Sequence, residues 1–84
     1  MPLDELKNRN KVIGSKQVKK AVSQGLATKV FIAQDAEPHV VEPLKQLCAQ
    51  NQVEVIMVEK MQVLGAACGI EVGSAAVALL IGKD

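Results

Sequence analysis

Three lysines stand close together in the stretch GSKQVKK, at the start of a predicted helix. They are Lys16, Lys19 and Lys20, and they follow Gly14 and Ser15. Acids are preferred at a helix N-terminus, and Lys16 and Lys20 form an unfavourable like-charge pair. The free N–H groups of a helix N-terminus bind phosphate, and lysines would add charge. The pattern favours an anion-binding surface; the alternative is an ordinary basic helix with Ser15 as its N-cap.

Basic and acidic residues are also separated along the chain as a whole. Its net charge is only +1, from ten basic and nine acidic residues. Seven of the basic residues and none of the acids lie between Leu6 and Gln34, so the remainder is acidic. Such a division suggests an anionic partner for one face, although solvated lysines can also cluster by chance. The sequence has no GxxxxGK[ST] motif, which argues against a nucleotide-binding P-loop.

A second unusual segment is the loop Gly69–Ser74, with the sequence GIEVGS. Loops are usually polar, yet this one contains Ile70 and Val72 between two glycines. Exposed apolar side chains in a loop can cover the face of a base or the surface of a partner. The alternative is that both side chains fold inward and anchor the loop.

The residues that could perform catalysis or bind metal form no recognisable constellation. His39 is the only histidine, and Cys48 and Cys68 are far apart and not in a CxxC motif. One histidine with two separated cysteines is a poor zinc site, so we expect no metal, no cofactor and no catalytic residue. The cysteines are expected to be buried and reduced, and Asp35 and Glu37 to help begin the helix that follows them.

The composition excludes several further classes. Hydrophobic residues make up 49% of the chain, but Phe31 is the only aromatic residue, so the core must be aliphatic. RNA-recognition and OB-type surfaces stack bases on exposed aromatics, which this chain lacks. The N-terminus has no apolar signal segment, and the uncharged run after Glu71 is too short to span a bilayer. We therefore expect a cytoplasmic protein, with Gly65 and Gly69 used for close packing rather than membrane dimerisation.

The hydrophobic pattern predicts helices and strands in alternation. Gly25 should end the helix that begins at Ser15, and Pro38 should lie in the first turn of another. The expected helices cover residues 3–9, 15–25, 61–68 and a segment from 38, and the expected strands cover 11–13, 28–33, 53–58 and 75–81. The strand around Phe31 and the last strand are apolar on both faces, so helices should cover both sides of the sheet. The expected fold is α/β: a single domain over residues 1–84, forming a three-layer α/β/α sandwich with about four strands in a mixed sheet.

Three segments together resemble the ribosomal L7Ae and L30e family of kink-turn RNA-binding proteins. They are VIGSKQVKKAVSQG, KVFIAQDAEP and LGAACGIEVGSAAVALL, in that order over nearly the whole chain. The resemblance is greatest to small bacterial members of the YbxF type. It implies an α/β/α sandwich that binds kink-turns, which are sharply bent RNA internal loops with tandem sheared G·A pairs.

The resemblance also implies an RNA site made from the start of the second helix and the loop before the last strand. On this chain, these positions and a further family position in the turn before Pro38 are Gly14, Ser15, Lys16, Gln17, Lys20, Glu37, Ile70, Glu71 and Val72. The chain departs from archaeal and eukaryotic members, which have an Asn-Glu pair in place of Lys16-Gln17. Lys and Gln can donate to base edges, but the glutamate acceptor for guanine amino groups is lost.

The resulting interpretation is a monomeric, non-catalytic protein that binds kink-turn RNA, either ribosomal RNA or a structured mRNA element. Lys16, Lys19 and Lys20 would approach phosphates, Gln17 would contact a base edge, and Val72 would pack with Ile70 on an extruded nucleotide. No DNA and no membrane are expected as partners. The alternative is a ribosome-associated protein-interaction module of the same fold, which would use the same loop against protein.

Overall fold

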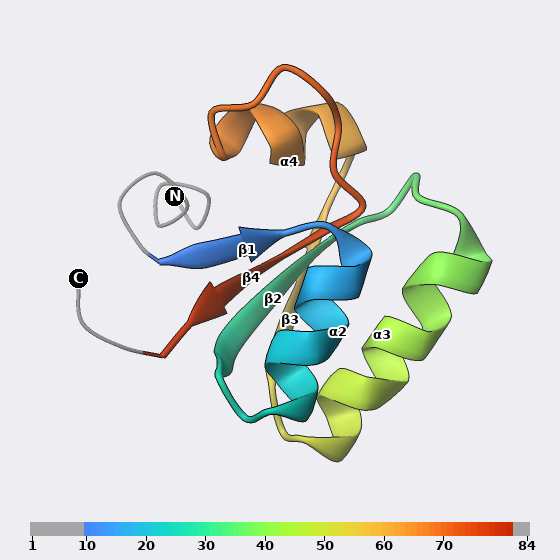
Figure 1. Cartoon of the computed structure of the whole chain (residues 1–84). Coiled ribbons are helices and arrows are strands. Elements are labelled where there is room, and N and C mark those ends of the chain that lie inside the picture. The colour runs from blue at the N-terminus through green and yellow to red at the C-terminus, as the bar shows by residue number, and fades with distance from the viewer. Residues whose placement is uncertain (1–9, 82–84) are drawn as a thin grey trace.

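The computed structural model describes residues 10–81 (Figure 1). The helix expected over residues 3–9 lies outside the described residues. The elements are β1 (Lys11–Ile13), α2 (Ser15–Ser23), β2 (Ala27–Ala33), α3 (Pro38–Gln50), β3 (Glu54–Val58), α4 (Met61–Ala67) and β4 (Ala76–Leu80). The alternation predicted within this range is confirmed, with boundaries shifted by one or two residues at most.

The four strands form one mixed sheet in the order β1-β4-β2-β3. The last strand lies inside the sheet, antiparallel to β1 and to β2, while β2 and β3 are parallel. Residues Ala76–Leu79 of β4 are all buried. A strand that has neighbouring strands on both sides and helices on both faces has no solvent-exposed face for polar side chains, which explains the apolar composition of β4. Phe31 on β2 is likewise fully buried, so it cannot stack on a base.

Helices cover both faces of the sheet, as predicted. α2 and α3 pack against one another on one face, and α4 lies across the other (Figure 1). Apart from Phe31 and Cys48, the core of residues 10–81 is aliphatic; α2 contributes Val18 and Val22, and α4 contributes Leu64. None of the helices among residues 10–81 has the length and apolarity needed to span a bilayer.

The end of α2 follows the local sequence closely. Gly25 has a φ of 73°, its N–H donates to the Val22 carbonyl at 3.1 Å, and the Leu26 N–H donates to the Ala21 carbonyl at 2.9 Å. This pair of bonds is a Schellman motif, which requires a left-handed residue after the helix, and glycine adopts that conformation without steric cost. The prediction that Gly25 ends this helix is confirmed.

The two cysteines differ in their environments. Cys48 is completely buried in the core, as predicted, whereas Cys68 is only partly buried. Burial raises the pKa of both thiols, and at Cys68 the nearby Lys11 ammonium partly offsets that increase.

A thiol-reactive probe should therefore distinguish the two cysteines. The thiolate is the reactive species, and a reagent reaches the fully buried Cys48 less readily than the partly buried Cys68. We expect Cys68 to be labelled first at pH 8, and Cys48 to react only as fast as the protein opens. Mass spectrometry of the labelled peptides checks this, with labelling in denaturant as the control. Equal rates at both positions in the native protein would contradict the burial of Cys48.

Candidate nucleic-acid interface

The segments predicted to bind RNA leave the sheet at the same edge. The N–H of Gly14, directly after β1, donates to the Ala76 carbonyl at 2.9 Å, and the Ala33 N–H donates to the Ala75 carbonyl at 2.9 Å. Since β4 is antiparallel to both β1 and β2, its beginning lies beside their ends. The start of α2, the β2–α3 turn and the α4–β4 loop therefore neighbour one another, as Figure 1 shows.

The beginning of α2 differs in one respect from the expectation. The N-cap is Gly14, not Ser15, and no side chain caps the helix there. Gly14 has a φ of 105°, and its carbonyl already accepts the Val18 N–H at 2.9 Å. The chain turns from β1 into α2 through a left-handed residue, a role that suits glycine, so Ser15 becomes the first helical residue. The helix therefore begins with backbone N–H groups that no N-cap side chain satisfies.

The lysines of α2 lie on its outer face. Lys16, Gln17, Lys19 and Lys20 are exposed, while Val18, Ala21 and Val22 turn inward. No acid occupies the first turn, but α2 has only nine residues, so Lys20 already lies in the last turn. The helix dipole favours a cation there, so the electrostatic penalty applies to Lys16 and not to Lys20. The face is nonetheless a run of exposed cations beside an uncapped helix N-terminus.

The α4–β4 loop, residues 68–75, exposes one of its two apolar side chains and partly buries the other. Val72 is 70% exposed, Glu71 is exposed, and Ile70 is partly buried. The Ile70 N–H also donates to the Gly65 carbonyl at 3.1 Å, which ties that residue to the end of α4. Val72 therefore presents an apolar side chain to solvent, whereas Ile70 is partly buried and its backbone is bonded to the end of α4.

Close backbone contacts hold this loop against α4. A Cβ atom on Gly65 would lie 2.1 Å from the carbonyl oxygen of Val72, and one on Gly73 would lie 2.9 Å from the Cβ of Met61. In addition, the Ser74 N–H donates to the Met61 carbonyl at 3.1 Å. The close packing expected of Gly65 is present, but its partner is the loop. A Cβ atom on Gly69 would instead meet no atom within 4 Å. Gly69 has a φ of 82°, so its role is to adopt the left-handed conformation of the turn after the helix.

The carboxylates of the β2–α3 turn have separate roles. Asp35 was expected to help begin α3; instead its Oδ1 accepts the N–H of Met61, the first residue of α4, at 2.8 Å. Glu37 is the N-cap residue of α3 without a side-chain capping bond. Its Oε1 lies 3.3 Å from Nε2 of His39, and both side chains are about three-quarters exposed.

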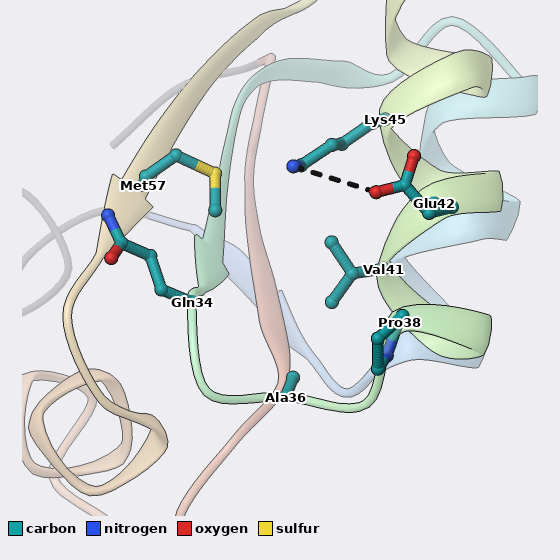
Figure 2. Close-up of a pocket in the computed structure, with 7 residues that line it drawn as sticks. All are labelled: Gln34, Ala36, Pro38, Val41, Glu42, Lys45 and Met57. Atoms are coloured by element: carbon teal, nitrogen blue, oxygen red, sulfur yellow. Dashed lines mark ion pairs between the residues drawn. The ribbon is translucent and has the colours of Figure 1, made fainter.

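A shallow hollow lies beside these segments but includes none of the predicted site residues. It has a volume of about 350 Å³ and lies between α3 and the edge strand β3. Figure 2 shows Lys45 and Val41 pointing into it from α3, opposite Met57 and Gln34. Its charged groups are one exposed pair, with Lys45 Nζ 3.9 Å from Glu42 Oε2. Among residues 10–81, no three His, Cys, Asp or Glu side chains come together as a potential metal site.

Sequence comparison places the chain among proteins named for RNA binding. It matches the Ribosomal protein L7Ae/L30e/S12e/Gadd45 family over residues 3–84. An RNA-binding protein of Halalkalibacterium halodurans is 48% identical over 68 residues, which cover 81% of this chain and 83% of the relative. The RNA-binding protein YbxF of Geobacillus stearothermophilus is 44% identical over 69 residues, covering 82% of this chain and 84% of the relative.

Structural comparison agrees. A 15.5 kDa RNA-binding protein of Giardia lamblia superimposes with a TM-score of 0.89 at 25% identity, covering 98% of this chain and 72% of that one. The predicted sandwich fold and the resemblance to YbxF-like proteins are thus both confirmed. Since the family match extends over nearly the whole chain, the protein belongs to the Ribosomal protein L7Ae/L30e/S12e/Gadd45 family.

Proposed function

We propose that this protein is a non-catalytic RNA-binding protein that recognises kink-turn RNA. The observation that carries the proposal is that an uncapped helix N-terminus with exposed lysines lies at the same edge of the sheet as a loop that packs on α4 and exposes a valine. The first suits phosphates, which bind N–H groups and cations. The second suits an unstacked base, whose face is apolar. The names of its relatives support RNA as the partner.

Each predicted site residue has a part in this proposal. Lys16, Lys19 and Lys20 approach phosphates, while Gly14 and Ser15 bring the N–H groups of the helix start close to the backbone of the bend. The amide of Gln17 contacts a base edge, where it can both donate and accept. Val72 packs on the extruded nucleotide and Ile70 supports the loop beneath it. The exposed carboxylates of Glu37 and Glu71 can accept hydrogen bonds from base amino groups.

The cellular setting follows from the same proposal. The family description names ribosomal proteins, which supports an association with the ribosome and a cytoplasmic location. The RNA would be ribosomal RNA or a structured mRNA element. One such site on one small domain requires neither a second subunit nor a cofactor, so we propose a monomer that acts without either.

A gel-shift titration tests this function directly. Wild-type protein is expected to bind a kink-turn RNA, and to bind at least tenfold more weakly to a matched RNA whose tandem G·A pairs are replaced by Watson–Crick pairs. The sheared pairs produce the bend, and a regular A-form helix presents neither the bend nor an extruded base. Equal affinity for both RNAs would indicate that the protein binds polyanions in general and does not recognise kink-turns. Binding to neither would favour the alternative, in which exposed Val72 contacts a protein.

A further inference from the structure

We propose that Asp35 is a positioning residue for the RNA-binding loop, acting through the first residue of α4. The proposal rests on the proposed function, because it concerns the same loop. Asp35 lies 26 residues before Met61, and no feature of the sequence connects them, yet the Asp35 carboxylate accepts the Met61 N–H at 2.8 Å. The bond joins the β2–α3 turn to the helix against which the α4–β4 loop packs.

The first step is that α4 has no N-terminal cap of its own. Its N-cap residue, Lys60, makes no side-chain capping bond, and no acid lies in its first turn. Lys60 has extended backbone and its carbonyl accepts the N–H groups of Val63 and Leu64. The N–H of Met61, as the first helical residue, has no acceptor within the helix. A helix of seven residues is too short to be stable by itself, so the acceptor that Asp35 provides fixes where α4 begins.

The second step is that Met61 contacts the loop directly. While its N–H is held by Asp35, its carbonyl accepts the N–H of Ser74 at 3.1 Å. Its Cβ lies so close to Gly73 that any side chain there would have to displace it. Ser74 is buried and its hydroxyl donates to the Ala76 carbonyl at 2.9 Å, so this end of the loop is fixed at the start of β4. A shift of Met61 therefore moves the segment that carries Val72.

The third step is that hydrogen bonds hold the backbone on both sides of Asp35. The Gln34 N–H donates to the Val58 carbonyl at 2.7 Å, and the Ala36 N–H donates to the Ala33 carbonyl at 3.3 Å. The backbone on both sides of Asp35 is thus tied to the sheet. The Asp35 side chain therefore joins the turn that carries Glu37 to α4, on which the loop that carries Val72 packs.

The negative charge of Asp35 also argues against direct contact between this residue and the RNA phosphates. Asp35 is an exposed acid at the edge where we propose that phosphates bind. A carboxylate there repels RNA, so the residue contributes to binding only if it does something other than contact the backbone. Capping α4 is that contribution, and it needs a hydrogen-bond acceptor rather than a negative charge.

The distinction between acceptor and charge defines the experiment. Asp35→Ala removes both, whereas Asp35→Asn keeps an oxygen that can accept the Met61 N–H. Exposed Glu59, two residues before Met61, provides a control in which Glu59→Ala removes an equal charge. Two quantities are measured for each variant: amide hydrogen exchange at Met61 and Ser74 by NMR without RNA, and affinity for the kink-turn RNA.

We expect Asp35→Ala to speed exchange at both amides about fivefold, in keeping with the loss of a helix cap, and to weaken RNA binding about three- to fivefold. Asp35→Asn should restore the wild-type exchange rates and an affinity at least as high as that of wild type, and Glu59→Ala should leave exchange unchanged. If Asp35→Ala exchanges and binds like wild type, or if Asp35→Asn fails as fully as Asp35→Ala, the proposal is overturned. Wild-type protein that binds no kink-turn RNA would overturn the proposed function instead, and exchange at Met61 and Ser74 would still decide whether Asp35 positions the loop.

Discussion

Gly65→Ala is expected to lower the free energy of unfolding by about 2 kcal/mol, although alanine is the better helix former. In an isolated helix this substitution would add about 1 kcal/mol of stability. In this fold the new methyl group would lie 2.1 Å from the Val72 carbonyl oxygen, with the backbone of Gly73 also in contact. Neither atom is the end of a flexible side chain, so the loop itself must move, and overpacking of this kind costs about 1–3 kcal/mol or more. In a domain of this size, 2 kcal/mol corresponds to a fall in Tm of roughly 8–16 °C.

A matched control separates the steric conflict from the general effect of replacing a glycine. Gly69→Ala, four residues later, meets no atom within 4 Å, and its cost comes only from the positive φ of 82°. That strain should cost about 1 kcal/mol and leave the loop packed on α4. Urea unfolding followed by circular dichroism gives both values. A rise in stability for Gly65→Ala, as helix propensity alone requires, would show that the loop does not lie against α4.

The sequence was sufficient for features that depend on local chemistry. Pro38 begins α3 and Gly25 ends α2, because each depends on residues within a few positions. The apolar composition of the last strand also predicted its burial on both faces. The unusual composition of GIEVGS marked the loop but left open whether its apolar side chains are exposed; the structure exposes Val72 and partly buries Ile70. Turns and caps can be predicted in this way because they are set by neighbouring residues.

Features that depend on tertiary contacts could not be predicted from the sequence or were predicted wrongly. Ser15 resembled an N-cap, but the turn out of β1 requires a left-handed residue and places Gly14 in that position. Asp35 resembled part of the turn before α3, whereas its partner is 26 residues away. Gly65 did give a usable signal, since a glycine inside a helix is costly and calls for a packing reason. Its partner, the carbonyl of Val72, could only come from the fold.

The second large effect is expected at the proposed RNA surface, and it separates contact with a base from general attraction to RNA. Val72→Ala should weaken kink-turn binding by about 1 kcal/mol or more, because it removes apolar surface that packs on the extruded nucleotide. Since Val72 is 70% exposed in the free protein, its truncation leaves no cavity, and the free energy of unfolding should change by less than about 0.5 kcal/mol.

Lys20→Ala provides the complementary measurement. Lys20 is exposed on α2, so its truncation should also leave the fold intact while weakening binding. It differs from Val72→Ala in removing a phosphate partner, and the slope of log K against log salt should therefore become shallower by about one, whereas Val72→Ala should leave that slope unchanged. Affinity at three salt concentrations and the Tm of both variants are measured together. If Val72→Ala lowered the Tm strongly while the affinity of the folded molecules stayed the same, the loop would be structural and Val72 would not belong to the binding site.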